Sequence, residues 1–172
     1  MAYCGMMAAL SVALMLMGGV IPIATYCVPM MSSILLLPLL FEFGRSAAWT
    51  AFASVSIITL LLGVDKEAAF FYLFLGYYPI VKWDLERIRR KQLRLTAKLI
   101  LFNASILIMY LFLGAVLNMD AVVQEFMTMG PWLLIAFAVL LNVCLLLYDK
   151  LLLPLLYLYA NRIRPRFRFL AR

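Results

Sequence analysis

Long apolar runs separated by short charged connectors dominate this sequence. A helix needs about 20 mostly apolar residues to cross the hydrocarbon core of a bilayer. Runs of about that length predict six spans, over residues 2–20, 25–43, 47–64, 67–82, 97–117 and 131–150. These runs are apolar on all sides, whereas strands of a membrane barrel alternate apolar and polar residues. We therefore expect an all-α, polytopic membrane protein, with six transmembrane helices in one bundle and a single integral membrane domain over residues 1–172.

The last apolar run is longer than a membrane span. It extends from residue 131 to residue 160, roughly 45 Å of helix against a hydrocarbon core of about 30 Å. Asp149 and Lys150 interrupt it. We interpret the sixth span as ending near Lys150, with residues 151–159 lying along the inner interface. The alternative is a long tilted helix whose Asp149 lies inside the membrane, where an ionisable residue is a functional candidate.

The basic residues predict how the chain is oriented. Most of the 15 lysine and arginine residues lie in the connector over 82–98 or in a basic tail over 161–172. With both termini in the cytoplasm, fourteen of the 15 lie on the cytoplasmic side and Lys66 alone lies outside. Because cytoplasmic loops carry an excess of lysine and arginine, we expect a multi-pass protein of the cell membrane with cytoplasmic N- and C-termini. Residues 84–96 predict a short amphipathic helix at the inner surface.

Composition indicates that lipid covers much of the chain. Hydrophobic residues make up 67% of the 172 residues and charged residues 13%, about half the charged share of soluble domains. A chain of this size cannot bury so much apolar surface within itself. The net charge of +7 does not indicate nucleic-acid binding, because the basic residues lie at the ends of apolar runs. The first run has no basic segment before it, so we expect it to remain in the mature protein.

The sequence lacks the residues of common catalytic and cofactor sites. It contains no histidine, which excludes a Ser-His-Asp triad, a Cys-His pair and an HExxH metal site. It contains no Walker-type or GxGxxG nucleotide motif. Cys4, Cys27 and Cys144 stand alone in apolar stretches, which predicts small buried side chains and not metal ligands. We therefore expect a protein that is not an enzyme and that holds no cofactor and no metal.

The first span carries a ladder of small residues. Gly5, Ala9 and Ala13 are spaced four apart, which places them on one helix face. Small residues let another helix approach closely, so the ladder predicts a partner-docking face, although chance ladders are common in such helices. The segment over residues 5–13 resembles the alanine-rich docking helix of substrate-binding S components of energy-coupling factor (ECF) transporters. The segment over residues 65–80 is similar to uncharacterised small membrane proteins of Gram-positive bacteria.

The resemblance to S components implies a function and a set of partners. Such a subunit captures a vitamin-like micronutrient from outside, and its small-residue ladder docks on a transmembrane coupling subunit that associates with two cytoplasmic ATPases. It implies that Ala9 and Ala13 contact this partner and that substrate enters beneath the connector between the first two spans. Position alone, on that outer side, then suggests the following substrate-binding residues, although outer aromatic residues also serve as interfacial anchors: Thr25, Tyr26, Asp65, Lys66, Glu67, Asn118, Asp120, Gln124 and Trp132.

Two asparagines lie inside the predicted spans. Asn103 in the fifth and Asn142 in the sixth are placed at comparable depth in the inner half of the membrane. Polar side chains in lipid need protein partners. We expect the two to join their helices by side-chain hydrogen bonds, typically worth about 0.6 kcal/mol in membranes.

A second class of function fits the same pattern. A non-transporting bacterial membrane protein, acting in assembly, sporulation or envelope processes through protein–protein contacts, also needs docking faces and basic cytoplasmic loops. A small molecule bound on the outer side, or neighbouring genes that encode ATPases, would separate the two classes.

Overall fold

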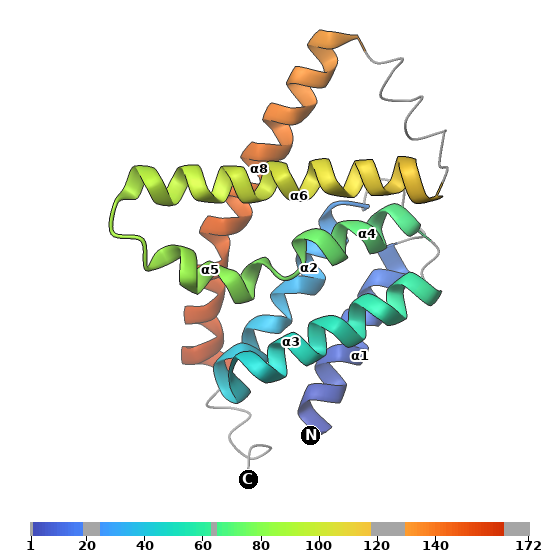
Figure 1. The fold of residues 1–172 in the computed structure, drawn as a ribbon. Coiled ribbons are helices and arrows are strands. Elements are labelled where there is room, and N and C mark those ends of the chain that lie inside the picture. Colours follow the sequence, from blue (N-terminus) through green and yellow to red (C-terminus); the bar gives the residue numbers. More distant parts are fainter. Residues whose placement is uncertain (1, 19–24, 63–64, 118–129, 164–172) are drawn as a thin grey trace.

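The computed structural model describes residues 2–18, 25–62, 65–117 and 130–163. All regular elements in these ranges are helical, which confirms the predicted all-α class. Figure 1 shows their arrangement. The elements are α1 (Ala2–Gly18), α2 (Cys27–Ile34), α3 (Leu36–Leu62), α4 (Lys66–Leu75), α5 (Tyr78–Glu86), α6 (Lys91–Leu117), α8 (Pro131–Leu158) and a π-helical turn, η2 (Tyr159–Ile163).

Three helices among the described residues are long and apolar enough to cross a membrane. They are Leu36–Leu62, Lys91–Phe112 and Ile135–Arg162. Large apolar side chains are exposed on all three, as expected for helices that lipid covers. The chain is therefore compatible with a membrane protein.

The predicted second span is divided into two helices. It comprises α2 and the first part of α3, with Leu35 between them. Pro29 and Pro38 each occupy the third position of their helix, where a proline costs no intrahelical hydrogen bond. A second break lies at Gly44, whose φ of 80° and ψ of −172° interrupt α3. A positive φ favours glycine, and this break falls in the expected connector between the second and third spans.

The predicted fourth span is also divided. It comprises α4 and α5, which meet at Gly76 and Tyr77. The Gly76 amide donates to the Tyr72 carbonyl oxygen at 2.7 Å, and a Cβ added at Gly76 would lie 2.5 Å from that oxygen. Only glycine fits such a close approach without a shift of the chain. Pro79 then lies in the first turn of α5, where its ring is tolerated.

The predicted amphipathic helix over 84–96 is not present as one element. α5 ends at Glu86, and α6 begins at Lys91, six residues before the expected start of the fifth span. The exposed Asp84 of α5 forms an ion pair with Arg45 of α3, and this guanidinium lowers the pKa of the Asp84 carboxyl.

The sixth span, which was expected to end near Lys150, lies in a helix that does not end there. α8 continues through Lys150 and Pro154 to Leu158 and then into η2. Pro154 removes one backbone hydrogen bond from the helix interior, but the helix remains continuous. The structure thus has one long helix that contains Asp149, and the depth of Asp149 in a membrane stays a prediction.

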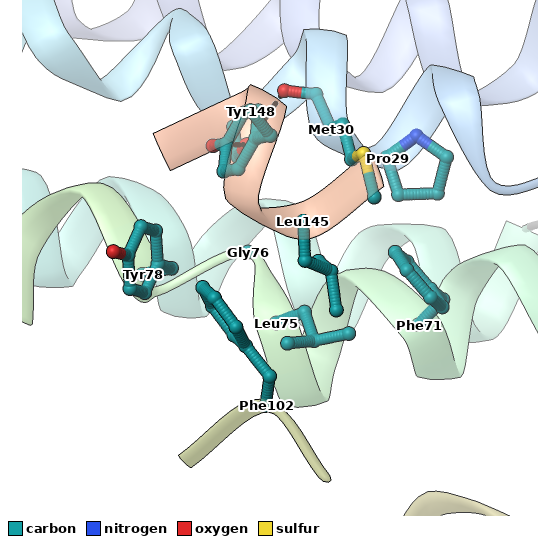
Figure 2. Close-up of a pocket in the computed structure, with 10 residues that line it drawn as sticks. Pro29, Met30, Phe71, Leu75, Gly76, Tyr78, Phe102, Leu145 and Tyr148 are labelled. Carbon is teal, nitrogen blue, oxygen red and sulfur yellow. Dashed lines mark hydrogen bonds between the residues drawn. The ribbon is translucent and has the colours of Figure 1, made fainter. Parts of the chain in front are cut away.

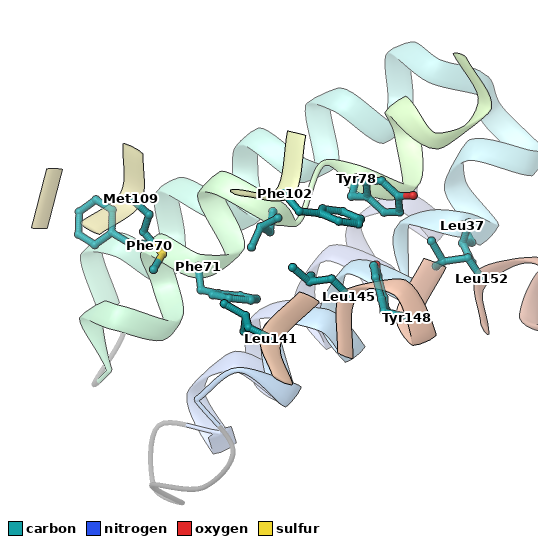
Figure 3. Packing of buried hydrophobic residues seen from close by; sticks show 11 residues of the cluster. Leu37, Phe70, Phe71, Tyr78, Phe102, Met109, Leu141, Leu145, Tyr148 and Leu152 are labelled. Carbon is teal, nitrogen blue, oxygen red and sulfur yellow. The ribbon is translucent and has the colours of Figure 1, made fainter. Parts of the chain in front are cut away.

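The helices pack around two groups of buried side chains. One joins α1, α3, α4 and α5 and contains Leu36, Leu39, Val55 and Tyr72. The other joins α4, α5, α6 and α8, and Figure 3 shows its middle, where Tyr78 lies between Phe102 and Tyr148. The steeply crossing α8 passes both α6 and α5 in Figure 1.

The two ends of α8 differ in their contacts. Its first half projects past α6 in Figure 1, and most of its large side chains are exposed, with Trp132 at 84%. Its far end reaches α1, where the hydroxyls of Tyr159 and Tyr3 lie 3.2 Å apart. The exposed first half is an apolar surface that needs lipid or protein to cover it.

The orientation of α8 can be tested by labelling. In a variant whose Cys4, Cys27 and Cys144 are replaced by alanine, Gly130→Cys and Asn161→Cys each place one thiol at an end of this helix. We expect an impermeant maleimide to label Gly130→Cys in intact cells and Asn161→Cys only after permeabilisation. The helix is long enough to cross the hydrocarbon core, and the basic residues after Asn161 favour the cytoplasmic side for that end. Equal labelling of both in intact cells would contradict this orientation.

Candidate functional site

Five polar side chains from distant parts of the sequence meet in what we call the carboxylate–tyrosine cluster. It consists of Thr25, Tyr26, Asp65, Glu67 and Tyr110. The Tyr26 hydroxyl donates to Glu67 Oε1 at 2.6 Å, and the Tyr110 hydroxyl donates to the same oxygen at 3.2 Å. Thr25 Oγ1 donates to Asp65 Oδ2 at 2.9 Å. The structure therefore brings together four of the residues that position alone suggested.

Local sequence explains how α4 presents its two carboxylates. Asp65 is the N-cap of α4, and its Oδ1 accepts from the Ala68 amide at 3.1 Å. Glu67 lies in the first turn, where the helix dipole favours negative charge. Both carboxylates are thus held at one helix end, facing the hydroxyls that immediately precede α2.

The other suggested substrate residues lie apart from this cluster or outside the described residues. Lys66 is exposed, and its Nζ donates to the Leu60 carbonyl oxygen at 2.8 Å. Trp132 is exposed near the start of α8. The candidates that lie outside the described residues are Asn118, Asp120 and Gln124.

Tyr110 belongs to the cluster although the sequence analysis did not select it. It lies in the apolar run of α6, and its hydroxyl lies 3.1 Å from that of Tyr26. A tyrosine hydroxyl within an apolar span needs a partner, which is the signal by which it could have been found.

A second group, the lysine–aspartate cluster, consists of Tyr78, Lys82, Glu86, Lys98 and Asp149. Lys82 Nζ lies 2.6 Å from Asp149 Oδ1, and Lys98 Nζ lies 2.7 Å from Asp149 Oδ2. The Tyr78 hydroxyl donates to Asp149 Oδ1 at 2.5 Å. Glu86 Oε1 accepts from Lys98 at 3.2 Å. Two cations and two anions from α5, α6 and α8 therefore balance one another.

This second cluster is buried. Exposed fractions are 3% for Lys82, 4% for Lys98 and 8% for Asp149. Taking such charges out of water costs several kcal/mol per ion, so removal of one partner is strongly destabilising. In the sequence, the two lysines lie at the predicted ends of two spans. The missed signal was an opposite charge, Asp149, at the same end of a neighbouring apolar run.

The enclosed space beside Tyr78 is too small for a substrate. Figure 2 shows this pocket between Tyr78, Phe102, Leu145 and Tyr148. Its volume is about 10 Å³, and about 10–15 Å³ is needed for a single water molecule. The Tyr148 hydroxyl lies 2.5 Å from Ser33 Oγ and so already has a partner.

The two asparagines inside the long helices pair with each other. Asn103 Nδ2 donates to Asn142 Oδ1 at 2.9 Å, and Asn142 Nδ2 donates to Asn103 Oδ1 at 3.2 Å. Each amide also donates to a carbonyl oxygen four residues earlier on its own helix. This reciprocal pair joins α6 to α8 and leaves neither amide aimed at a ligand.

The small-residue ladder lies on an exposed face of α1. Gly5, Ala9 and Ala13 are all exposed, and a Cβ added at Gly5 would meet nothing within 4 Å. The packed face is a different one: Ser11 and Ser32 each donate to the other's carbonyl oxygen, at 3.4 and 3.2 Å. The ladder is therefore not used for contacts among the described helices.

Cysteine burial differs from the sequence-based expectation. Cys27 and Cys144 are exposed and Cys4 is half-buried, which is reasonable for apolar helices whose outer faces lie in lipid. Within the described ranges, no three cysteine, aspartate or glutamate side chains are grouped so as to hold a metal ion.

The contribution of the lysine–aspartate cluster to stability can be measured with neighbouring substitutions. We expect Asp149→Asn to lower the free energy of unfolding by about 3–5 kcal/mol, because it leaves two buried lysines without their shared carboxylate. The matched control, Lys150→Gln, removes the adjacent exposed charge and should change the free energy of unfolding by less than about 0.5 kcal/mol. Unfolding by sodium dodecyl sulfate in mixed micelles provides the measurement. Equal effects of the two variants would contradict the cluster.

The chain was compared with protein-family models, curated proteins and solved structures. None of the three comparisons gives a match. The two polar clusters and the exposed face of α1 therefore carry the functional argument.

Proposed function

We propose that this chain is the substrate-binding membrane subunit of an ECF-type importer for a vitamin-like micronutrient, energised by separate ATPases. In this proposal it crosses the cell membrane six times, with both termini in the cytoplasm. The observation that carries it is the convergence of Thr25, Tyr26, Asp65 and Glu67, which the structure draws from separate segments. In the proposed topology these residues lie on the outer side, from which an imported substrate would arrive.

The chemistry of the carboxylate–tyrosine cluster indicates which substrates suit it. Two carboxylates and three hydroxyl groups meet there, and the only nearby cation in the sequence, Lys66, points to the Leu60 carbonyl. A substrate with amine or hydroxyl donors would replace the tyrosine donors on Glu67. Charge-assisted hydrogen bonds of this kind are about twice as strong as neutral ones.

The exposed ladder supplies the second part of the proposal. Gly5, Ala9 and Ala13 form a shallow face with no partner among the described residues. A transmembrane coupling subunit could place a helix close to this face, because small side chains permit close backbone approach. Binding from outside would then be followed by reorientation that the partner ATPases drive.

The alternative is a non-transporting protein that works by binding other membrane proteins. Two observations favour it: the carboxylates already have hydrogen-bond partners within the chain, and the first half of α8 exposes a large apolar surface. Both features suit a protein that binds other membrane proteins and does not capture a small molecule.

Docking can be tested with bulky substitutions. We expect Ala9→Trp combined with Ala13→Trp to abolish copurification of a coupling subunit and ATPases from native membranes, because two indoles fill the shallow face. The matched control is Ala136→Trp, which replaces an exposed alanine of α8 and should leave copurification unchanged. Undiminished copurification with the double variant would refute docking on α1.

Ligand capture can be tested by native mass spectrometry of the detergent-purified protein. We expect the wild type to retain a small molecule and Glu67→Gln to retain at least about tenfold less, since loss of a charged hydrogen bond costs about 1.5–3 kcal/mol. Lys66→Gln, one residue away and facing elsewhere, should behave as the wild type. If the wild type holds no small molecule, the non-transporting alternative is favoured.

A further inference from the structure

A larger cavity adjoins the lysine–aspartate cluster. It lies between α5, α6 and the C-terminal half of α8, and its volume is about 330 Å³. This is the size of typical ligand pockets, which begin at about 300 Å³. We call it the basic cavity, because its lining contains five basic side chains and two acidic ones.

Three of the five cations have no counter-ion within the described part of the chain. The two buried lysines are paired with the two carboxylates, as described above. The other three, Lys91, Arg94 and Lys150, make no side-chain hydrogen bond or ion pair with any residue that the structure describes. The basic cavity therefore presents about three uncompensated positive charges, which favour an anion with more than one oxygen acceptor.

The lining of the basic cavity also includes three leucines, which we call the leucine wall. Leu95 from α6 and Leu146 and Leu153 from α8 line it together with the cations. A free inorganic anion gains nothing from such a wall, whereas an amphiphile buries its chain there. The combination of a cationic rim and a leucine wall therefore matches a molecule with an anionic head and a hydrocarbon tail.

The depth of the basic cavity also matches a lipid headgroup. Asp149 lies 18 residues along α8 from Pro131, which corresponds to ~27 Å of helix, close to the thickness of the hydrocarbon core. Lys91 is the first residue of α6. In the proposed topology, with Pro131 at the outer surface, both residues lie near the inner membrane surface, where lipid phosphates are found.

We propose that the basic cavity binds the phosphate of an anionic phospholipid, with Lys91, Arg94 and Lys150 around the phosphate oxygens. The acyl chain lies along the leucine wall. Basic pockets between membrane helices on the cytoplasmic side suit such headgroups. The site is separate from the carboxylate–tyrosine cluster and does not depend on the proposed transport function.

The test uses the full chain in mixed micelles, titrated with phosphatidylglycerol or phosphatidylcholine and followed by native mass spectrometry. We expect retention of phosphatidylglycerol in preference to phosphatidylcholine. Lys91→Gln combined with Arg94→Gln should weaken this retention about 30-fold, the effect of removing two charges near an anionic membrane surface. The charge-matched control is Arg89→Gln combined with Arg162→Gln, which alters two exposed cations outside the cavity lining and should retain the lipid.

Each result decides the proposal. Selective phosphatidylglycerol binding that 10-fold excess inorganic phosphate does not displace, and that only the Lys91 and Arg94 variant loses, supports a lipid site. Displacement by inorganic phosphate, without preference between the two lipids, would show a free-phosphate site and overturn the lipid assignment. Equal retention by both double variants would show that the basic cavity is not the binding site.

Discussion

The position of Asp149 between Lys82 and Lys98 is the constraint on which the arrangement of α5, α6 and α8 depends. Its carboxylate pairs with two lysines that are almost wholly buried, and Glu86 supplies the second negative charge. Separation of any of the three helices would leave a charge in an apolar environment, at a cost of several kcal/mol. The crossing of α8 over α6 is therefore specified by charge, whereas the apolar surfaces around it permit many packings.

α6 connects this constraint to the carboxylate–tyrosine cluster. Lys98 lies near its start, and Tyr110 lies twelve residues later, ~18 Å along the helix. The Asn103–Asn142 pair occupies the interval between them. Through these side chains α6 makes polar contacts with α4, α5 and α8, which restrict its rotation and its depth relative to them.

Apolar patterning was sufficient to predict the helical class and several boundaries, such as the connector at Gly44 and the start of α4, which was expected at residue 67 and lies at Lys66. It did not predict the divisions at Leu35 and Gly76. The residues on both sides of each division are equally apolar, so the apolar pattern does not indicate where the helix axis bends. Contacts between polar side chains were harder to predict from the sequence. The comparable depth of Asn103 and Asn142 can be predicted by counting residues along each span. The pairing of Asp149 with two lysines also depends on how three helices are rotated relative to one another, and the spacing of residues in the sequence does not give that rotation.

The contact between Tyr3 and Tyr159 gives the molecule a junction between its first and last helices. The ladder on α1 begins two residues from that junction, and η2 begins at it. A protein seated on α1 would therefore lie beside η2 and the end of α8, the helix that also carries Asp149.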